Sequence, residues 1–137
     1  MRMSRALFDE MVAHARAEYP NECCGIVASV DGGAVRVFPA RNEFHSPLRY
    51  RMDAKDQYWI QDQIDTQRWD YGAVYHSHTR SAPRPSQTDI NEAFRPEIGP
   101  IWPGSIYIII GLENEELDVR AWRIESSTPE AATLEIE

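Results

Sequence analysis

The stretch YGAVYHSHTRSAPRPSQTD, residues 71–89, combines a strand pattern, a stiff polar loop and the start of a helix. Residues 72–78 are rich in Val and aromatic side chains, which favour a β-strand. Two prolines then stiffen the loop, and Ser86 and Asp89 stand in the N-cap and N3 relation of a helix. We therefore predict a strand at 72–78 and a short helix that begins after Ser86 and ends before Pro96.

The segments on either side of this stretch predict an α/β fold. Ser4 can cap a helix whose apolar residues recur at helical spacing until Pro20 ends it. The runs 24–30 and 34–39 flank an Asp-Gly-Gly turn and predict a β-hairpin. Further predicted elements are a short strand in 46–53, a helix at 54–68 capped by Asp53 and Asp56, a surface loop at 95–104, and strands at 105–110 and 117–124. We expect a sheet with helices packed against it, with residues 1–125 as one domain and 126–137 as a loosely ordered tail.

The composition of the chain restricts its class and its partners. Its 137 residues suit one domain, and 42% hydrophobic with 26% charged residues is typical of globular proteins. A formal net charge of -8 without a basic cluster excludes nucleic acid as the expected partner. No apolar stretch reaches membrane-spanning length, and acidic residues interrupt the first 20 positions, so we expect no signal peptide and no membrane contact. The two cysteines are adjacent, which disfavours a disulfide between them and suits a reducing, cytoplasmic location.

Two histidines in this strand form a candidate metal site. Side chains two apart on a strand share a face, so His76 and His78 would lie side by side at about 7 Å backbone separation. The pair alone is weak evidence for a metal site, because a strand can also place one histidine on the surface and bury the other against a hydrogen-bond partner. Asp89 adds a third ligand of the kind that zinc takes in catalytic sites. In the competing interpretation, Ser86 and Asp89 form only a helix cap.

Glu22, in the sequence YPNECCG, is the candidate proton acceptor. A metal-activated water still needs a nearby base, and a carboxylate at the mouth of the first predicted strand suits that role. The alternative is a solvated loop carboxylate. His14 and His45 have no partner at ligand spacing, and we leave both out of the site.

These residues together resemble the JAMM motif of the MPN+ metalloprotease family. Glu22 stands before Cys-Cys-Gly and a hydrophobic strand, and His76-x-His78 is followed by seven residues, Ser86, two residues and Asp89. The resemblance covers nearly the whole chain and implies a single MPN-like domain, with a mixed β-sheet flanked by helices in a cytidine-deaminase-like architecture. It also implies a zinc ion held by the two histidines, Asp89 and a water, with Glu22 as general base and Ser86 as hydrogen-bond donor to the oxyanion. One departure is Thr79, where many relatives have proline.

The resemblance also implies a substrate. The wider family cleaves peptide or isopeptide bonds after the Gly-Gly tails of ubiquitin and ubiquitin-like proteins. This chain is similar to the short bacterial members that release cysteine from a small sulfur-carrier protein, since 137 residues leave no room for the insertions of longer members. We expect such a carrier as partner. From their position alone, segments 44–52 and 95–104 are candidate groove walls. Arg49 and Arg51 are candidates for contacts with carboxylates, and the alternative is that they are exposed arginines without a specific contact.

Two other functions stay open at this point. The same fold serves as a metal-free binding scaffold, although such members lose motif residues that this chain keeps. A metal-dependent amidase acting on a small molecule in secondary metabolism is the other alternative.

Deamination is disfavoured. Zinc deaminases carry the motifs H-x-E and P-C-x-x-C, and both motifs are absent here. Cys23 and Cys24 lie beside the proposed base, and we expect a packing role for at least one of them.

Overall fold

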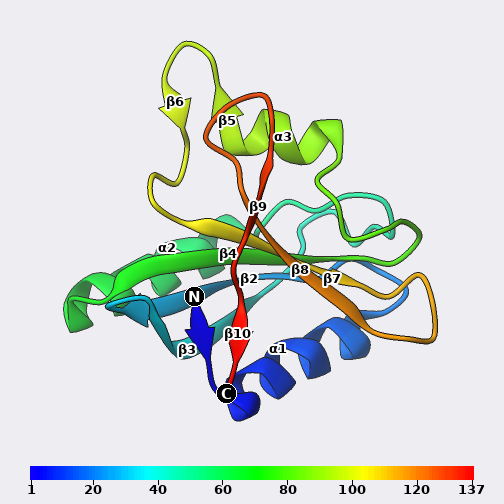
Figure 1. Cartoon of the computed structure of the whole chain (residues 1–137), viewed down its shortest axis with the longest axis horizontal. Helices are drawn as coiled ribbons and strands as arrows, with labels where there is room; N and C mark the ends of the chain where they lie inside the picture. Colours follow the sequence, from blue (N-terminus) through cyan, green and yellow to red (C-terminus); the bar gives the residue numbers. More distant parts are fainter.

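Eight strands form one mixed sheet in the computed structural model, which describes residues 1–137 (Figure 1). Their order across the sheet is β10-β1-β3-β2-β4-β7-β8-β9. The strands are β1 (Arg2–Met3), β2 (Cys24–Val30), β3 (Gly33–Ala40), β4 (Asp70–His78), β7 (Ile106–Gly111), β8 (Asp118–Arg123), β9 (Glu130–Ala132) and β10 (Glu135–Ile136). A separate ribbon pairs β5 (Phe94–Arg95) with β6 (Gly99–Pro100).

The three predicted helices are present, and each begins at the predicted cap. In α1 (Arg5–Glu18), the Ser4 hydroxyl accepts a hydrogen bond from the Leu7 N–H. In α2 (Ala54–Gln67), the Asp53 carboxylate accepts from the Asp56 N–H. The third helix, α3 (Gln87–Ala93), begins after Ser86. These side-chain oxygens satisfy backbone N–H groups that have no partner inside the helix.

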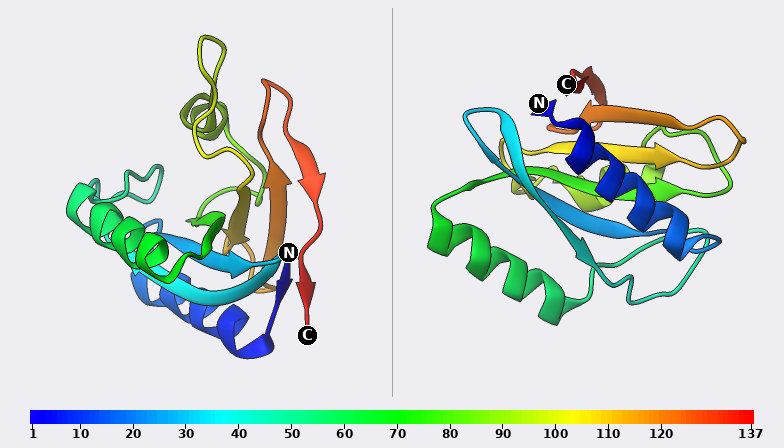
Figure 2. Two further views of the ribbon diagram at one scale, coloured as in Figure 1. Left: turned by 90° about the vertical axis from the view of Figure 1, so that its left-hand side faces the viewer. Right: turned by 90° about the horizontal axis from the view of Figure 1, so that it is seen from below.

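The two long helices cover opposite faces of the curled sheet (Figure 2). Alternation along β2 explains this arrangement, because successive side chains point to opposite faces. Val27, with Cys23 just before the strand, packs in the core on the α1 side. Cys24 and Ile26 pack in the core on the α2 side. This two-sided burial accounts for the nearly continuous apolar sequence of β2.

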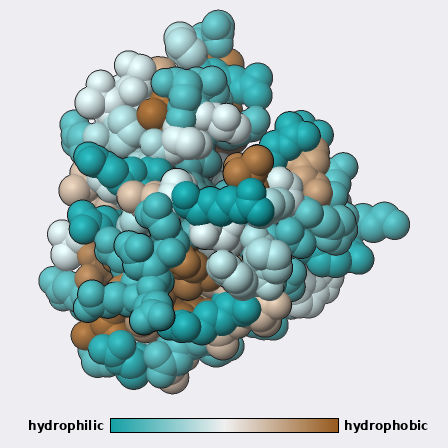
Figure 3. Space-filling view, turned by 90° about the vertical axis from the view of Figure 1, so that its right-hand side faces the viewer, coloured by the Kyte–Doolittle hydropathy of each residue, from teal (hydrophilic) through white to brown (hydrophobic).

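Strand β4 lies in the middle of the sheet and positions the candidate site at its C-terminal end. It pairs antiparallel with β2 and parallel with β7, and Cys24 lies opposite His76 in the register. Val74 belongs to the core on the α2 side, so His76 and His78, at the same parity, point to that face. Figure 3 views the molecule from the side toward which β4 runs, where hydrophilic residues dominate and hydrophobic ones show only in small separate areas.

The structure differs from the sequence predictions in two segments. The predicted strand in 46–53 is wrong: this segment is a loop, closed by one isolated bridge between Asn42 and Met52. Residues 126–137, expected to be loosely ordered, contain β9 and β10, which pair with β8 and β1. β1, β9 and β10 have only two or three residues each, shorter than the runs that indicate a strand in a sequence, which explains why they were not predicted.

The remaining elements confirm the expected α/β fold, a mixed sheet flanked by helices. The loop 95–104 is present as predicted, except that it contains most of the short β5–β6 ribbon. Every helix of the chain is too short or too polar to cross a membrane.

Candidate active site

Two buried histidines at the end of β4 form the centre of the site. The Nε2 atoms of His76 and His78 lie 3.1 Å apart, and only 1% and 4% of the two residues are exposed. The ring of Tyr50 stacks on the ring of His76 at a centroid distance of 4.5 Å. The two imidazoles are therefore fixed by strand geometry and by aromatic packing.

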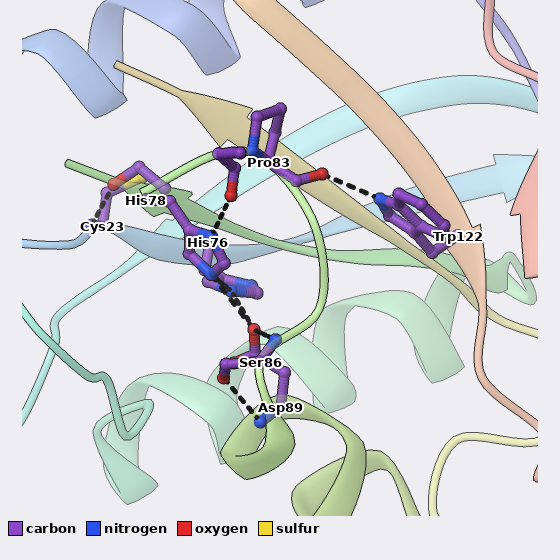
Figure 4. A network of polar contacts seen from close by, with 9 residues as sticks. Cys23, His76, His78, Pro83, Ser86, Asp89 and Trp122 are labelled. Atoms are coloured by element: carbon purple, nitrogen blue, oxygen red, sulfur yellow. Dashed lines mark hydrogen bonds and ion pairs between the residues drawn. The ribbon is translucent and has the colours of Figure 1, made fainter. Parts of the chain in front are cut away.

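Asp89 joins this pair from the first turn of α3 (Figure 4). Its Oδ2 atom lies 3.3 Å from Nε2 of His76 and 3.0 Å from Nε2 of His78. The same oxygen accepts a hydrogen bond from the Ser86 N–H at 2.9 Å, and the Ser86 hydroxyl accepts one from the Asp89 N–H at 3.1 Å. The helix cap predicted from the sequence is thus present, and it holds the carboxylate against the histidines.

The loop between β4 and α3 is held at the start of its proline segment. The Nδ1–H group of His78 donates to the Ala82 carbonyl at 2.8 Å, and Nε1–H of Trp122 donates to the Pro83 carbonyl at 3.0 Å (Figure 4). Gly111 packs against this loop, where a Cβ atom would come within 2.9 Å of the Pro83 ring. These contacts fix the distance between the strand and the helix that carry the three side chains.

The three converging atoms, Nε2 of His76, Nε2 of His78 and Oδ2 of Asp89, are mainly hydrogen-bond acceptors, and too few hydrogens lie between them to give each one a donor. Because the Ala82 carbonyl can only accept, neutral His78 carries its proton on Nδ1 and presents a lone pair on Nε2. The ionised Asp89 carboxylate has only acceptors, and Nδ1 of His76 is buried without a hydrogen-bond partner. One cation would satisfy all three ligand atoms, which lie within 4.8 Å of one another. Two histidines and a carboxylate are a set that zinc accepts in catalytic sites, so these residues fit the ion.

Electrostatic coupling within the trio shifts the pKa values of its members. Burial alone would raise the pKa of Asp89, but the neighbouring His76 and His78 and the Ser86 N–H outweigh burial and lower it. Burial alone would lower the pKa of His78, but its hydrogen bonds to Asp89 and to the Ala82 carbonyl outweigh burial and raise it. A proton therefore competes with a metal ion for this trio, so metal affinity should increase as pH rises.

Glu22 lies between α1 and β2 and is only 6% exposed, so it is no solvated loop carboxylate. Its backbone N–H donates to the Ser46 carbonyl at 2.8 Å, and its own carbonyl accepts from the Asn42 side chain at 3.1 Å. Burial raises the pKa of the Glu22 carboxyl to about 8, and the negative charge of Asp89 adds to the rise while His78 opposes it. The carboxyl thus lies close enough to the trio to interact with its charges.

This burial predicts a pH-dependent stability difference between the metal-free wild type and Glu22→Gln. The folded-state pKa of about 8 exceeds the ordinary value of 4.5, so between these pH values the folded chain holds a proton that the unfolded chain has lost. The wild type should therefore lose stability relative to the variant as pH rises from 5 to 9, by about 2 to 4 kcal/mol. Urea unfolding of chelator-treated proteins measures the difference. Glu43→Gln, which removes an exposed carboxylate, is the control, and parallel curves for wild type and Glu22→Gln would contradict the assignment.

The two cysteines and the other two histidines lie outside the trio. Cys23 and Cys24 are at most 1% exposed, on opposite faces of the sheet, and burial raises the pKa of Cys23 to about 12. Both thiols therefore pack in the core. His14 Nδ1 lies 2.7 Å from the Tyr75 hydroxyl, and His45 is an exposed loop residue, so neither joins the trio.

Sequence reasoning missed two residues beside the site. Tyr50 stacks on His76, and Asn42, which is 7% exposed, uses its side-chain amide to join the backbones of Glu22, Phe44, Arg49 and Arg51. Tyr50 lies in the segment 44–52 that the sequence offered as a groove wall. Asn42 carries no sequence signal, because its role depends on how a loop folds back.

The chain belongs to the family described as prokaryotic homologs of the JAB domain, which matches residues 4–125. This family assignment agrees with the resemblance found in the sequence and with the mixed sheet and helices of the structure.

The chain is also similar to particular proteins. The chain is 36% identical over 93 residues to a protein of Mycobacterium tuberculosis named CysO-cysteine peptidase, and the match covers 66% of this chain but only 64% of that relative, less than two thirds of its length. It is 33% identical over 109 residues to a protein of Haloferax volcanii named desampylase, covering 74% of this chain and 73% of the relative. Among solved structures, protein DSY2949 from Desulfitobacterium hafniense has a TM-score of 0.82 at 28% identity, covering 100% of this chain and 93% of that one.

Proposed function

We infer that the chain is a zinc-dependent peptidase that hydrolyses the amide bond after a C-terminal Gly-Gly of a small ubiquitin-like or sulfur-carrier protein. The group released is cysteine or another short adduct. The observation that carries this proposal is the convergence of His76 Nε2, His78 Nε2 and Asp89 Oδ2 at 3.0 to 3.3 Å beside a buried carboxyl. The names of two relatives, a CysO-cysteine peptidase and a desampylase, support a peptidase acting on such a carrier. The expected cytoplasmic location stays a prediction.

The proposed roles divide between a trio that holds the ion and two residues that act on the substrate. His76, His78 and Asp89 would hold zinc. When bound, the ion polarises the scissile carbonyl, lowers the pKa of a water ligand to about 7 and favours the ionised form of a nearby carboxyl. Glu22 would then accept a proton from the attacking water at its carboxylate and pass that proton to the leaving amine.

Ser86 is suited to stabilise the negative charge that develops on the carbonyl oxygen. Its hydroxyl oxygen accepts the hydrogen bond from the Asp89 N–H, which leaves the hydroxyl hydrogen free to donate. The residue is exposed, so a substrate can reach it. The cap role and the oxyanion role are therefore compatible in one side chain.

The test of the proposed function is hydrolysis of a carrier adduct. Zinc-loaded protein is incubated with a ubiquitin-like carrier that ends in Gly-Gly-Cys, and the mass of the carrier is followed. We expect the carrier to lose its terminal cysteine, and a free peptide with the same tail to react much more slowly, because it lacks the binding energy of the folded carrier. Survival of all Gly-Gly amides, with cleavage of a small-molecule amide, would replace the carrier proposal with the amidase.

A further inference from the structure

A cavity of about 330 Å³ lies beside the trio and has no role in the mechanism above. His76 and Asp89 contribute to its wall. Buried side chains of β4 and β7, among them Val74, Tyr107 and Ile109, line it as well. A group attached to the scissile amide would therefore have an apolar space next to the reacting atoms.

Two arginines at this cavity have no anionic partner. Arg49 and Arg51 are exposed, and their guanidinium groups lie 4.2 Å and 5.3 Å from the centre of the Phe44 ring. The arginines that form ion pairs lie elsewhere: they are Arg2, Arg41, Arg120 and Arg123. The other charged residues that line the cavity are Asp89, whose carboxylate contacts the two histidines, and Glu92. Two cations without an ion pair on one ring thus provide a local site for an anion.

The backbone that carries these arginines is tied to the backbone of Glu22. The Asn42 side chain donates to the carbonyls of Glu22 and Arg49, both at 3.1 Å, and accepts from the Arg51 N–H at 3.1 Å. One buried amide thus joins the proposed general base to the loop of the two arginines. An anion bound by the arginines would be held in a defined position relative to the reacting bond.

A buried hydroxyl in the same cavity lacks a partner. Tyr107 is 6% exposed, and its hydroxyl makes no hydrogen bond within the chain. A buried polar group without a partner is costly, so a ligand that reaches the Tyr107 hydroxyl with a polar atom would gain a hydrogen bond. The cavity therefore matches a small group with an apolar body, a polar atom and a negative charge.

We propose that this cavity binds the residue released by hydrolysis, with the free α-carboxylate of that residue held by Arg49 and Arg51 and its side chain near Tyr107. This inference rests on the proposed function and makes the protein a carboxypeptidase that removes one amino acid. Hydrolysis breaks the C–N bond; the water oxygen stays on the glycine carboxylate, and a proton passes to the amine of the released amino acid. Guanidinium groups suit this recognition because they bind carboxylates in a fixed planar geometry.

The experiment compares two carrier adducts that differ only at the last group. One ends in Gly-Gly-Cys with a free carboxylate, and the other ends in the corresponding carboxamide. We expect wild-type kcat/KM to be about 10- to 100-fold lower for the carboxamide, the range for a lost charged hydrogen bond. The double variant Arg49→Gln, Arg51→Gln should lose this preference, because only hydrolysis of the free-acid adduct should become slower. Arg36→Gln is the matched control, since Arg36 also stacks on a phenylalanine, at 4.3 Å, but does not line the cavity.

A binding measurement separates recognition from turnover. Calorimetry with the Glu22→Gln variant should show tighter binding of the free acid than of the carboxamide, and the two arginine substitutions should remove the difference. Equal cleavage of both adducts by the wild type would overturn the inference and leave the proposed function intact. Equal slowing of both adducts by the double variant would also overturn it, since the arginines would then contact the carrier. If neither adduct is cleaved, the proposed function fails and the inference fails with it.

Discussion

Replacing Glu22 with Gln should lower the rate of amide hydrolysis by about 10²- to 10⁴-fold while the protein keeps its zinc. The amide has the size of the carboxyl but cannot accept a proton from water at neutral pH. Glu22 is not one of the three converging ligands, so metal retention should be unaffected. Initial rates with the carrier adduct, together with metal analysis of the same samples, measure both effects.

A matched control separates this effect from a general loss of negative charge. Glu18→Gln removes an exposed carboxylate at the end of α1 and should leave the rate unchanged. Turnover of Glu22→Gln at the wild-type rate would mean that another group accepts the proton. Loss of zinc from this variant would instead indicate that Glu22 supports the metal site.

Removing two ligands should abolish metal binding. We expect wild-type protein to retain about one zinc per chain, as a three-ligand site with an open position does. The double variant His78→Ala, Asp89→Ala should retain almost none. Because zinc binds the folded state, chelation should also lower the Tm of the wild type, by the equivalent of about 4 kcal/mol when zinc is at 1,000 times its Kd. The Tm of the double variant should not respond to the chelator.

Ser86→Ala distinguishes loss of the metal from loss of the helix cap. Asp89 serves both features, so its removal alone would leave the cause of instability ambiguous. The serine variant loses the cap, at a cost of about 1 kcal/mol, and keeps all three ligands. It should therefore bind zinc like the wild type.

Two outcomes would contradict the metal site. Unchanged metal content in the His78→Ala, Asp89→Ala variant would eliminate the site formed by these residues. An unaffected Tm of chelated wild type would favour the scaffold function.

The centre of the site was predictable because strand and helix geometry determine it. A spacing of two on a strand brings His76 and His78 to one face, and the cap signal of Ser86 and Asp89 locates the start of α3. The link between strand and helix is a short loop stiffened by prolines, which limits the distance between them. Local rules thus placed three side chains that the structure finds in contact.

Features that local rules do not determine were not predictable in this way. β10 pairs with β1 from the opposite end of the chain, and β9 pairs with β8 across a short loop, but both strands are shorter than the runs that indicate a strand in a sequence. Segment 46–53 has the residues of a strand but no neighbour to pair with, so it forms a loop pinned by Asn42. The cavity and its unpaired Tyr107 hydroxyl arise where that loop meets the sheet and α3, a packing outcome that no single segment encodes.

Zinc titration of chelator-stripped protein, with the mass of the carrier adduct as readout, tests whether hydrolysis depends on zinc bound at this site. The metal-free protein should leave the Gly-Gly-Cys adduct intact. Hydrolysis should then rise with added zinc and reach a plateau at about one equivalent per chain, as expected for a single catalytic ion. Full hydrolysis by the metal-free protein, or equal recovery by the His78→Ala, Asp89→Ala variant, would contradict a zinc-dependent peptidase built on His76, His78 and Asp89.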